Sequence, residues 1–487
     1  EKWGFLSDVE QQMQEIALPR VREALQKQGQ DMEKLAQLPR DQAMDIIQPL
    51  LRREMAKARK EMGAGVDSLL EMLASYRDGE AKDFNTAVAG YLAYADESPR
   101  FDMARVRTEA FFDRVEPFYQ CIGLFIVVFA VGFVGMLSTA FSPEAGRAIG
   151  RAAFWLALLT LLFQSWALIT RMYIQDRPPV TNLYSAAVWI SWGCVLLGLS
   201  LEGLFRNGIG NIVAAVPGCL SVFLAHHLAG SGDTLGMLQA VLDTNFWLAT
   251  HVTVVTFGYV ATLVAGVIGA IYVLFGMLTP AIERNLGAAL GQLIFGAICF
   301  ATIIGFMASM FVGVGFMASM FVGVSVGVLF AAGLGLIYLL FWFSTSQVDR
   351  TLGKVLSQML YAVLCFGTFL SFTGTVLGGL WADYSWGRFW GWDPKENGAL
   401  IIVLWNALIL HARWGGIVKQ RGIAVLSIVG IMVVGWSFIG TNQLGVGLHS
   451  YGFSNTLAAI LVYCWAGCLA LIAWSAYPGR WWLNKQF

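Results

Sequence analysis

The stretch WGRFWGWDPKEN at 386–397 lies between two long apolar runs, 356–381 and 398–415. A link between two membrane helices needs only a few polar turn residues, yet this one holds three tryptophans. Large aromatic surface left in a loop costs free energy unless something covers it. We therefore expect two membrane helices joined by a loop that receives a flat, apolar partner.

The composition also indicates a membrane protein. Hydrophobic residues make up 57% of the chain and charged residues 13%, with a mean hydropathy of +0.62. This is too apolar for a soluble domain of such length. Apolar runs near the roughly 20 residues that cross a bilayer lie at 118–138, 150–171, 183–203, 211–229, 247–278, 288–310, 325–346, 356–381, 398–415, 422–440 and 455–476. The predicted fold is all-α, a polytopic membrane helical bundle of about 11 spans.

One part of this series is less regular than the rest. GFMASMFVGV occurs twice in direct succession, at 305–314 and 315–324. We interpret the tandem copy as a recent duplication, and it leaves the number of spans over 288–346 open.

Before about Glu116 the sequence changes character. Segments such as DQAMDIIQPLLRREMAKARKEM place apolar residues at helical spacing with charges between them. We predict an extramembrane helical region at 1–116 and a transmembrane domain at 117–487, with an external loop at 381–397. The first region is either a solvated module or a surface that docks a partner. Because the chain begins at Glu1 without Met, we expect a processed or truncated product.

Lysine and arginine in the short loops predict the orientation. One alternate set of loops and the C-terminal tail are rich in them, and such loops are cytoplasmic: Arg147, Arg206, Arg284, Arg350, Lys354, Arg413, Lys419, Arg421, Arg480 and Lys485. An odd number of spans then places the N-terminal region and the tryptophan loop outside and the C-terminus in the cytoplasm. The net charge of zero gives no indication of a nucleic-acid partner.

Cysteine usage and missing motifs exclude several classes. All seven cysteines lie in apolar runs, which predicts packing roles rather than disulfides. The sequence has no CxxCH, the covalent haem attachment motif, and no P-loop. The chain is therefore neither a c-type cytochrome nor a protein that hydrolyses ATP by itself.

The histidines are few, and each is informative: His226, His227, His251, His411 and His449. On the predicted topology His251 and His449 begin spans at the outer face, beside the tryptophan loop. His411 lies about 20 Å down the span that descends from that loop. Two imidazoles beside an apolar aromatic shelf are what a haem requires, with Arg388 to pair with propionates.

Plainer interpretations stay open at this point. The tryptophans could form an interfacial aromatic belt, and His251 and His449 could be capping or hydrogen-bonded interfacial residues. The same interpretation applies more strongly to His226 and His227. His411 could merely satisfy a backbone carbonyl.

Longer stretches narrow these alternatives. WADYSWGRFWGWDPKENGAL resembles the tryptophan-rich "WWD" signature of the haem-handling membrane proteins of cytochrome c maturation, most closely the CcsA-type subunit of System II cytochrome c synthase. The stretches RPPVTNLYSAAVWISW, HVTVVTFGYVATLVAGVIGAIYVL, LILHAR and GVGLHSYGF resemble other parts of the same family. The resemblance covers most of 170–475 and none of the first 116 residues.

The resemblance implies two haem sites. At the outer face, His251 and His449 would bind the iron of haem b beside a platform that includes Trp381, Trp386, Arg388, Trp390, Trp392 and Asp393. His411 would be one ligand of an earlier, inner haem. Its second ligand would come from a CcsB-type partner or fused domain, since no histidine precedes His226. The chain departs from the family at 288–346 and at Asn397-Gly398.

The resemblance also implies a function in the bacterial cytoplasmic membrane. Haem is captured at the inner site, moves to the outer face, and is presented to an apocytochrome c whose CxxCH thiols form thioethers with the vinyl groups. The chain would then be a cytochrome c synthase together with the CcsB-type part. The substrate cysteines are the nucleophiles, so none is expected from this chain. Asp393 and Glu396 are expected to orient Arg388 and Lys395 or to cap the helix that begins near Pro394.

Two other functions remain candidates. A haem exporter or chaperone would share the platform but pass haem on without forming bonds. A membrane cytochrome b would need pairs of histidines within its spans, and the single intramembrane His411 argues against it.

Overall fold

The computed structural model describes residues 4–27, 39–99, 101–139, 142–229, 234–236, 243–278, 351–447, 455–476, 478 and 482. Within these residues the structure is helical and contains no strand. The chain divides into two compact units, 1–108 and 109–487. The boundary falls inside helix α6, Met103–Val115.

The first unit consists of amphipathic helices, α1 (Gly4–Lys27), α3 (Arg40–Glu61), α4 (Ala64–Asp78) and α5 (Ala81–Glu97). A small apolar cluster joins α1 to α3, with Val21 and Leu25 buried against the isoleucines and leucines of α3. The Arg20 guanidinium also donates to both carboxylate oxygens of Glu61, at 2.7 and 2.8 Å. The unit is thus held by a narrow core and surface ion pairs.

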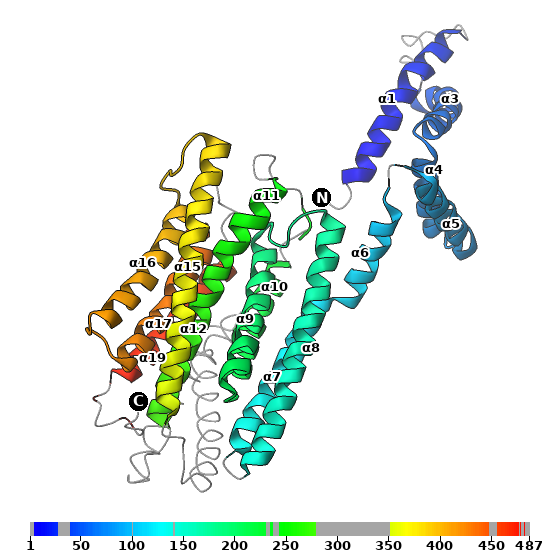
Figure 1. Ribbon diagram of the computed structural model, residues 1–487. Helices are drawn as coiled ribbons and strands as arrows, with labels where there is room; N and C mark the ends of the chain where they lie inside the picture. The colour runs from blue at the N-terminus through cyan, green and yellow to red at the C-terminus, as the bar shows by residue number, and fades with distance from the viewer. Residues whose placement is uncertain are drawn as a thin grey trace. The chain divides into compact units, whose positions relative to one another are not determined.

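The second unit is a bundle of long apolar helices (Figure 1). Eight of the described helices are long and apolar enough to cross a membrane, as expected for a polytopic membrane protein. The predicted spans 288–310 and 325–346 lie outside the described residues, as does the repeat at 305–324. Each of the other predicted spans coincides with a helix.

One group of helices consists of α7 (Pro117–Ser138), α8 (Pro143–Gln175), α9 (Leu183–Phe205) and α10 (Ile209–Ala229). α7 packs on α8 and α10, and α9 packs on α10. The α9–α10 contact is close because a Cβ added to Gly198 would lie 2.5 Å from the backbone of Ala214. Small residues at such contacts are the usual device of membrane helices, since lipid offers no hydrophobic driving force.

The other group contains α12 (Thr253–Leu278), α15 (Leu352–Trp386), α16 (Pro394–Trp414), α17 (Gln420–Gly435) and α19 (Asn455–Ser475). Three short elements complete it, α11 (Asn245–Trp247), the π-helix η2 (Leu248–Val252) and, after α17, the π-helix η3 (Trp436–Gly440) followed by α18 (Thr441–Gln443). α12 packs against α15, α17 and α9, so it joins the two groups. Figure 1 shows α12 in green beside α15 in yellow.

Candidate functional site

The link between α15 and α16 is shorter than the predicted loop 381–397. α15 continues through Trp386 and ends at Gly387, which takes the left-handed conformation at φ 67°. α16 begins at Pro394, after Asp393 as its N-cap. Only 387–393 is non-helical, because no glycine or proline follows Trp381 before Gly387 and Asp-Pro starts the next helix. The predicted loop bounds 381–397 were therefore too wide, whereas the expected helix start near Pro394 is confirmed.

Asp393 and Glu396 form a capping box at the start of α16. The Asp393 carboxylate accepts the Lys395 backbone N–H at 2.8 Å, and Glu396 accepts the Asp393 backbone N–H at 3.2 Å. Glu396 also accepts the Gly391 N–H at 2.8 Å and pairs with the Arg388 guanidinium at 3.3 Å. The predicted capping role is therefore confirmed, as is the orientation of Arg388 by Glu396. Asp393 is buried, with 6% of its surface exposed.

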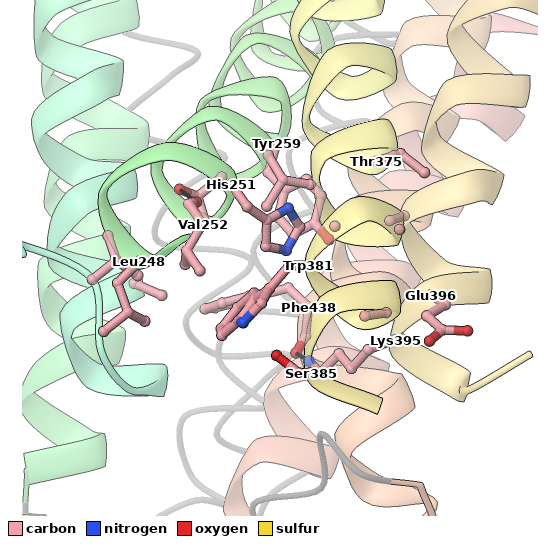
Figure 2. Close-up of a pocket in the computed structure, with 18 of the residues that line it drawn as sticks. Leu248, His251, Val252, Tyr259, Thr375, Trp381, Ser385, Lys395, Glu396 and Phe438 are labelled. Carbon is pink, nitrogen blue, oxygen red and sulfur yellow. Dashed lines mark hydrogen bonds between the residues drawn. The ribbon is translucent and has the colours of Figure 1, made fainter. Parts of the chain in front are cut away.

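A cavity of about 180 Å³ lies beside this link. It is lined by side chains from 180–186, η2, α12, α15, the link, α16 and η3, among them His251, Trp381, Trp386, Trp390, Lys395 and Glu396. Figure 2 shows His251 and Trp381, from neighbouring helices, pointing toward one another across it. The structure thus brings together one predicted histidine and three of the predicted tryptophans.

His251 is held in one orientation. It lies in η2, a π-helical turn of the kind often found at functional sites. Its Nδ1–H donates to the carbonyl oxygen of Gly374 at 2.8 Å, which leaves the lone pair of the neutral ring on Nε2. The ring also lies against Gly378, where an added Cβ would be 2.5 Å from Cε1.

The tryptophans surround this imidazole unequally. The Trp381 ring lies 5.7 Å from that of His251 and stacks on Trp247 at 6.4 Å. Within the described structure the buried indole N–H groups of Trp381 and Trp390 have no hydrogen-bond acceptor. Buried donors without an acceptor are rare in proteins, and a bound water, ion or ligand usually satisfies them. Trp392 instead is 71% exposed and does not line the cavity.

The cation that lines the cavity is not the one that the sequence analysis predicted. Arg388 is directed to Glu396 and does not line the cavity, although its guanidinium lies 5.7 Å from the Trp386 ring. Lys395 lines the cavity, and its Nζ donates to the carbonyl of Phe438 at 2.6 Å. Lys395 was expected near the loop but not in the haem site. It comes inward because the N-cap sets the first turn of α16 against η3.

His449 lies outside the described residues. The described chain ends just before it at Gly447, where φ is +94° and an added Cβ would lie 2.3 Å from the Asp393 carboxylate. The segment that leads to His449 therefore packs on the buried cap of α16.

His411 lies near the other end of α16, about 25 Å from Pro394 along the helix. Its imidazole is exposed, its Nδ1–H donates to the Ala407 carbonyl at 2.7 Å, and its ring is 5.5 Å from Trp414. The carbonyl contact is the one that the plainer interpretation proposed.

His226 and His227 end α10 and do not line the cavity. The His226 ring lies 5.0 Å from Tyr119, and His227 Nδ1–H donates to the Phe223 carbonyl at 3.0 Å. His226 therefore contacts α7, and His227 contacts its own helix.

Gly374 and Gly378 were missed by the sequence analysis. They are spaced as GxxxG on α15, a pattern typical of close helix contacts in membranes. That signal predicts a close neighbour, but not that the neighbour is an imidazole.

The donor set fits haem as cargo at the mouth of the cavity. It offers an imidazole with its lone pair on Nε2, aromatic faces, two indole N–H donors and an ammonium group. The volume of about 180 Å³ is below the roughly 300–1,000 Å³ of pockets that enclose small molecules. This conformation therefore presents a surface for the macrocycle rather than enclosing it.

Comparison with known proteins places this cavity inside a recognised region. Residues 180–449 match the family model described as cytochrome C assembly protein. A "Cytochrome c biogenesis protein CcsA" from Parasynechococcus marenigrum (strain WH8102) is 30% identical over 342 residues, which cover 69% of this chain and 98% of the relative. Proteins of the same name from Prochlorococcus marinus (strain NATL2A) and Pinus thunbergii are each 30% identical, over 65% and 61% of this chain and 90% and 85% of their own lengths. All residues that line the cavity fall within 180–449.

Proposed function

Because this chain belongs to the cytochrome c assembly family, as a multi-pass CcsA-type protein of cytochrome c maturation, we propose that it carries haem b across the membrane and presents it outside for attachment to apocytochromes c. The observation that supports this most is the imidazole of His251. It lines the cavity beside Trp381, with its tautomer set by the bond to Gly374.

His251 serves as one axial ligand of the outer haem. Metal-binding histidines usually donate their second ring N–H to a carbonyl or carboxylate, which fixes the ring and raises its basicity. The Nδ1–H bond to Gly374 has this form. His449 supplies the opposite ligand, and the packing of Gly447 on Asp393 supports its approach to the same site.

Trp381, Trp386 and Trp390 provide the apolar surface for the macrocycle, and the two indole N–H groups without acceptors serve as donors to its polar edge. Lys395 is the nearest cation for a propionate, because Arg388 is engaged with Glu396. Asp393 acts through the fold: it caps α16 and thereby fixes Lys395 and Glu396.

Attachment needs no nucleophile from this chain. Each substrate cysteine adds its S–H across a vinyl group, so that a C–S bond forms, the hydrogen goes to the neighbouring carbon, and nothing leaves. The protein contributes positioning and exclusion of water. A histidine of the substrate then replaces one of the two outer ligands.

His411 is a ligand of haem at an inner site. Its exposure on the surface of α16 supports a second ligand from a CcsB-type partner or domain that packs there. The platform faces the outside of the bacterial cytoplasmic membrane, together with residues 1–116, and the C-terminus is cytoplasmic. The distribution of lysine and arginine supports this orientation.

Reconstitution tests the function directly. The full chain, with a CcsB-type partner, is supplied with haem and an apocytochrome c, and covalent haem is measured after denaturing electrophoresis. We expect covalent product that depends on His251. Haem that passes to the apocytochrome but stays extractable would instead establish the haem chaperone.

A further inference from the structure

A second cavity, of about 560 Å³, lies among α7, α8 and the turn from α9 to α10. Its size is that of pockets which hold small molecules. The first cavity is lined at the start of α9 by Leu183, and this one is lined beyond its end by Arg206. On α9 the lining of the first cavity reaches Ala186 and that of the second begins at Glu202, so about 24 Å of helix separates the two.

We infer that this second cavity binds the headgroup of an anionic phospholipid, with its phosphate between Arg147 and Arg151. Both arginines line the cavity from α8, one helical turn apart, and both are exposed. In the part of the chain that the structure describes, neither takes part in an ion pair. Guanidinium groups at this spacing can bind one phosphate through several charge-assisted hydrogen bonds.

The remaining charges of the cavity favour an anion. Arg206 adds a third positive charge, and its Nε–H donates to the Gly203 carbonyl at 3.4 Å. Glu202 is the one acid among the described lining residues, and its carboxylate accepts the backbone N–H groups of Gly208 and Gly210 at 2.9 and 3.0 Å. The described lining thus carries three positive charges against one negative charge that is already hydrogen-bonded.

Two glycines in the wall leave space in this cavity. A Cβ added to Gly150 or Gly203 would meet no atom within 4 Å. These two residues line the cavity, and Met136 and Phe154 form an apolar part of its wall.

A lipid fits better than a free anion because α8 continues the site with an apolar stripe. Trp155, Leu159 and Leu162 follow Arg151 at spacings of four and three residues, and they are 64%, 58% and 58% exposed. Residues at this spacing share one helix face. A headgroup at the arginines would therefore place acyl chains along the stripe. Basic pockets between membrane helices are known to bind anionic headgroups in this way.

Native mass spectrometry of the full chain in detergent tests the inference, with phosphatidylglycerol and phosphatidylcholine as probes. We expect preferential binding of phosphatidylglycerol, weakened roughly 10- to 30-fold in the Arg147→Gln/Arg151→Gln variant. The matched control, Lys354→Gln/Lys419→Gln, removes two exposed positive charges far from the cavity in sequence and should bind like the unchanged protein. Gly203→Phe, which fills the cavity and keeps every charge, should also weaken binding.

Equal binding by the double arginine variant, or an equal loss in the lysine control, would overturn the proposal. Haem provides the remaining comparison, since its two propionates share the anionic chemistry. If haem displaced phosphatidylglycerol from the unchanged protein, and its binding fell in the arginine variant but not in His251→Gly, the cavity would be a carboxylate site and the lipid assignment would be wrong. The lipid measurements do not bear on the outer haem site, because the two cavities share no lining residue.

Discussion

His251 donates its Nδ1 proton to the carbonyl of Gly374, 2.8 Å away, although 123 residues separate the two along the chain. The bond joins η2 to α15 at the wall of the cavity. It fixes both the tautomer and the plane of the ring, which are the two properties an axial ligand needs before iron arrives.

The first prediction concerns this ligand. His251→Gly should keep the fold, because the side chain is only half-buried, but should lose axial ligation at the outer haem. Added imidazole should restore the haem spectrum and covalent cytochrome formation. His226→Gly removes a ring that contacts Tyr119 of α7 and does not line the cavity, so it is the control and should need no rescue. Haem spectra of the His251 variant that match the unchanged protein without imidazole would remove His251 from the site.

A second prediction follows from the close contact at Gly378. Gly378→Ala would put a methyl group 2.5 Å from Cε1 of His251, so the ring must leave its bond to Gly374. We expect haem affinity to fall roughly 10- to 100-fold, as when other supporting contacts of metal ligands are removed. Gly467→Ala on α19 meets no atom within 4 Å and should bind haem normally. Haem titration of both purified variants checks this, and equal affinities would contradict it.

We expect the effect of a tryptophan substitution on haem binding to depend on whether the side chain lines the cavity. Trp390→Ala removes a wall of the cavity, whereas Trp392→Ala removes a side chain that is 71% exposed and lies outside it. Haem occupancy after purification should therefore fall several-fold more for Trp390→Ala. Trp381→Phe keeps most of the aromatic surface but removes an N–H without an acceptor, and an intermediate loss is expected. A larger defect at Trp392 would mean that the macrocycle lies elsewhere on the link.

Asp393 should act as a helix cap. Asp393→Ala leaves the first turn of α16 uncapped and should destabilise it by about 0.5–2 kcal/mol, whereas Asp393→Asn keeps a side-chain acceptor and should cost little. Thermal unfolding in detergent and haem occupancy should therefore follow the order Asp, Asn, Ala. If Asn were as defective as Ala, the negative charge itself would be the functional feature.

The orientation is tested by cysteine labelling. Tyr384 near the end of α15 is 82% exposed, and Ile417 between α16 and α17 is 80% exposed. A membrane-impermeant maleimide added to intact cells should label Tyr384→Cys and spare Ile417→Cys, which should react only after lysis. The reverse pattern would place the tryptophan link in the cytoplasm and exclude presentation outside.

Residues close together in the sequence determined much of the secondary structure and the family assignment of this protein. The lengths of the apolar runs identified the described spans. Each run must be a helix, because backbone N–H and C=O groups that lack hydrogen bonds are costly in lipid. Asp393 and Pro394 fixed the start of α16, since a cap is decided by residues within one turn. The family resemblance rested on contiguous motifs in the same way, and comparison with the CcsA-type proteins confirmed it.

The tertiary structure decided which of these residues meet. Trp390 and Lys395 turn into the cavity while Trp392 and Arg388 do not, because the handedness of a short link and the packing of α16 on η3 set each direction. The support of His251 by Gly374 and Gly378 depends on the register of α15 against α12 and η2. A glycine spacing predicts a close contact, but only the packing of the helices determines which side chain makes it.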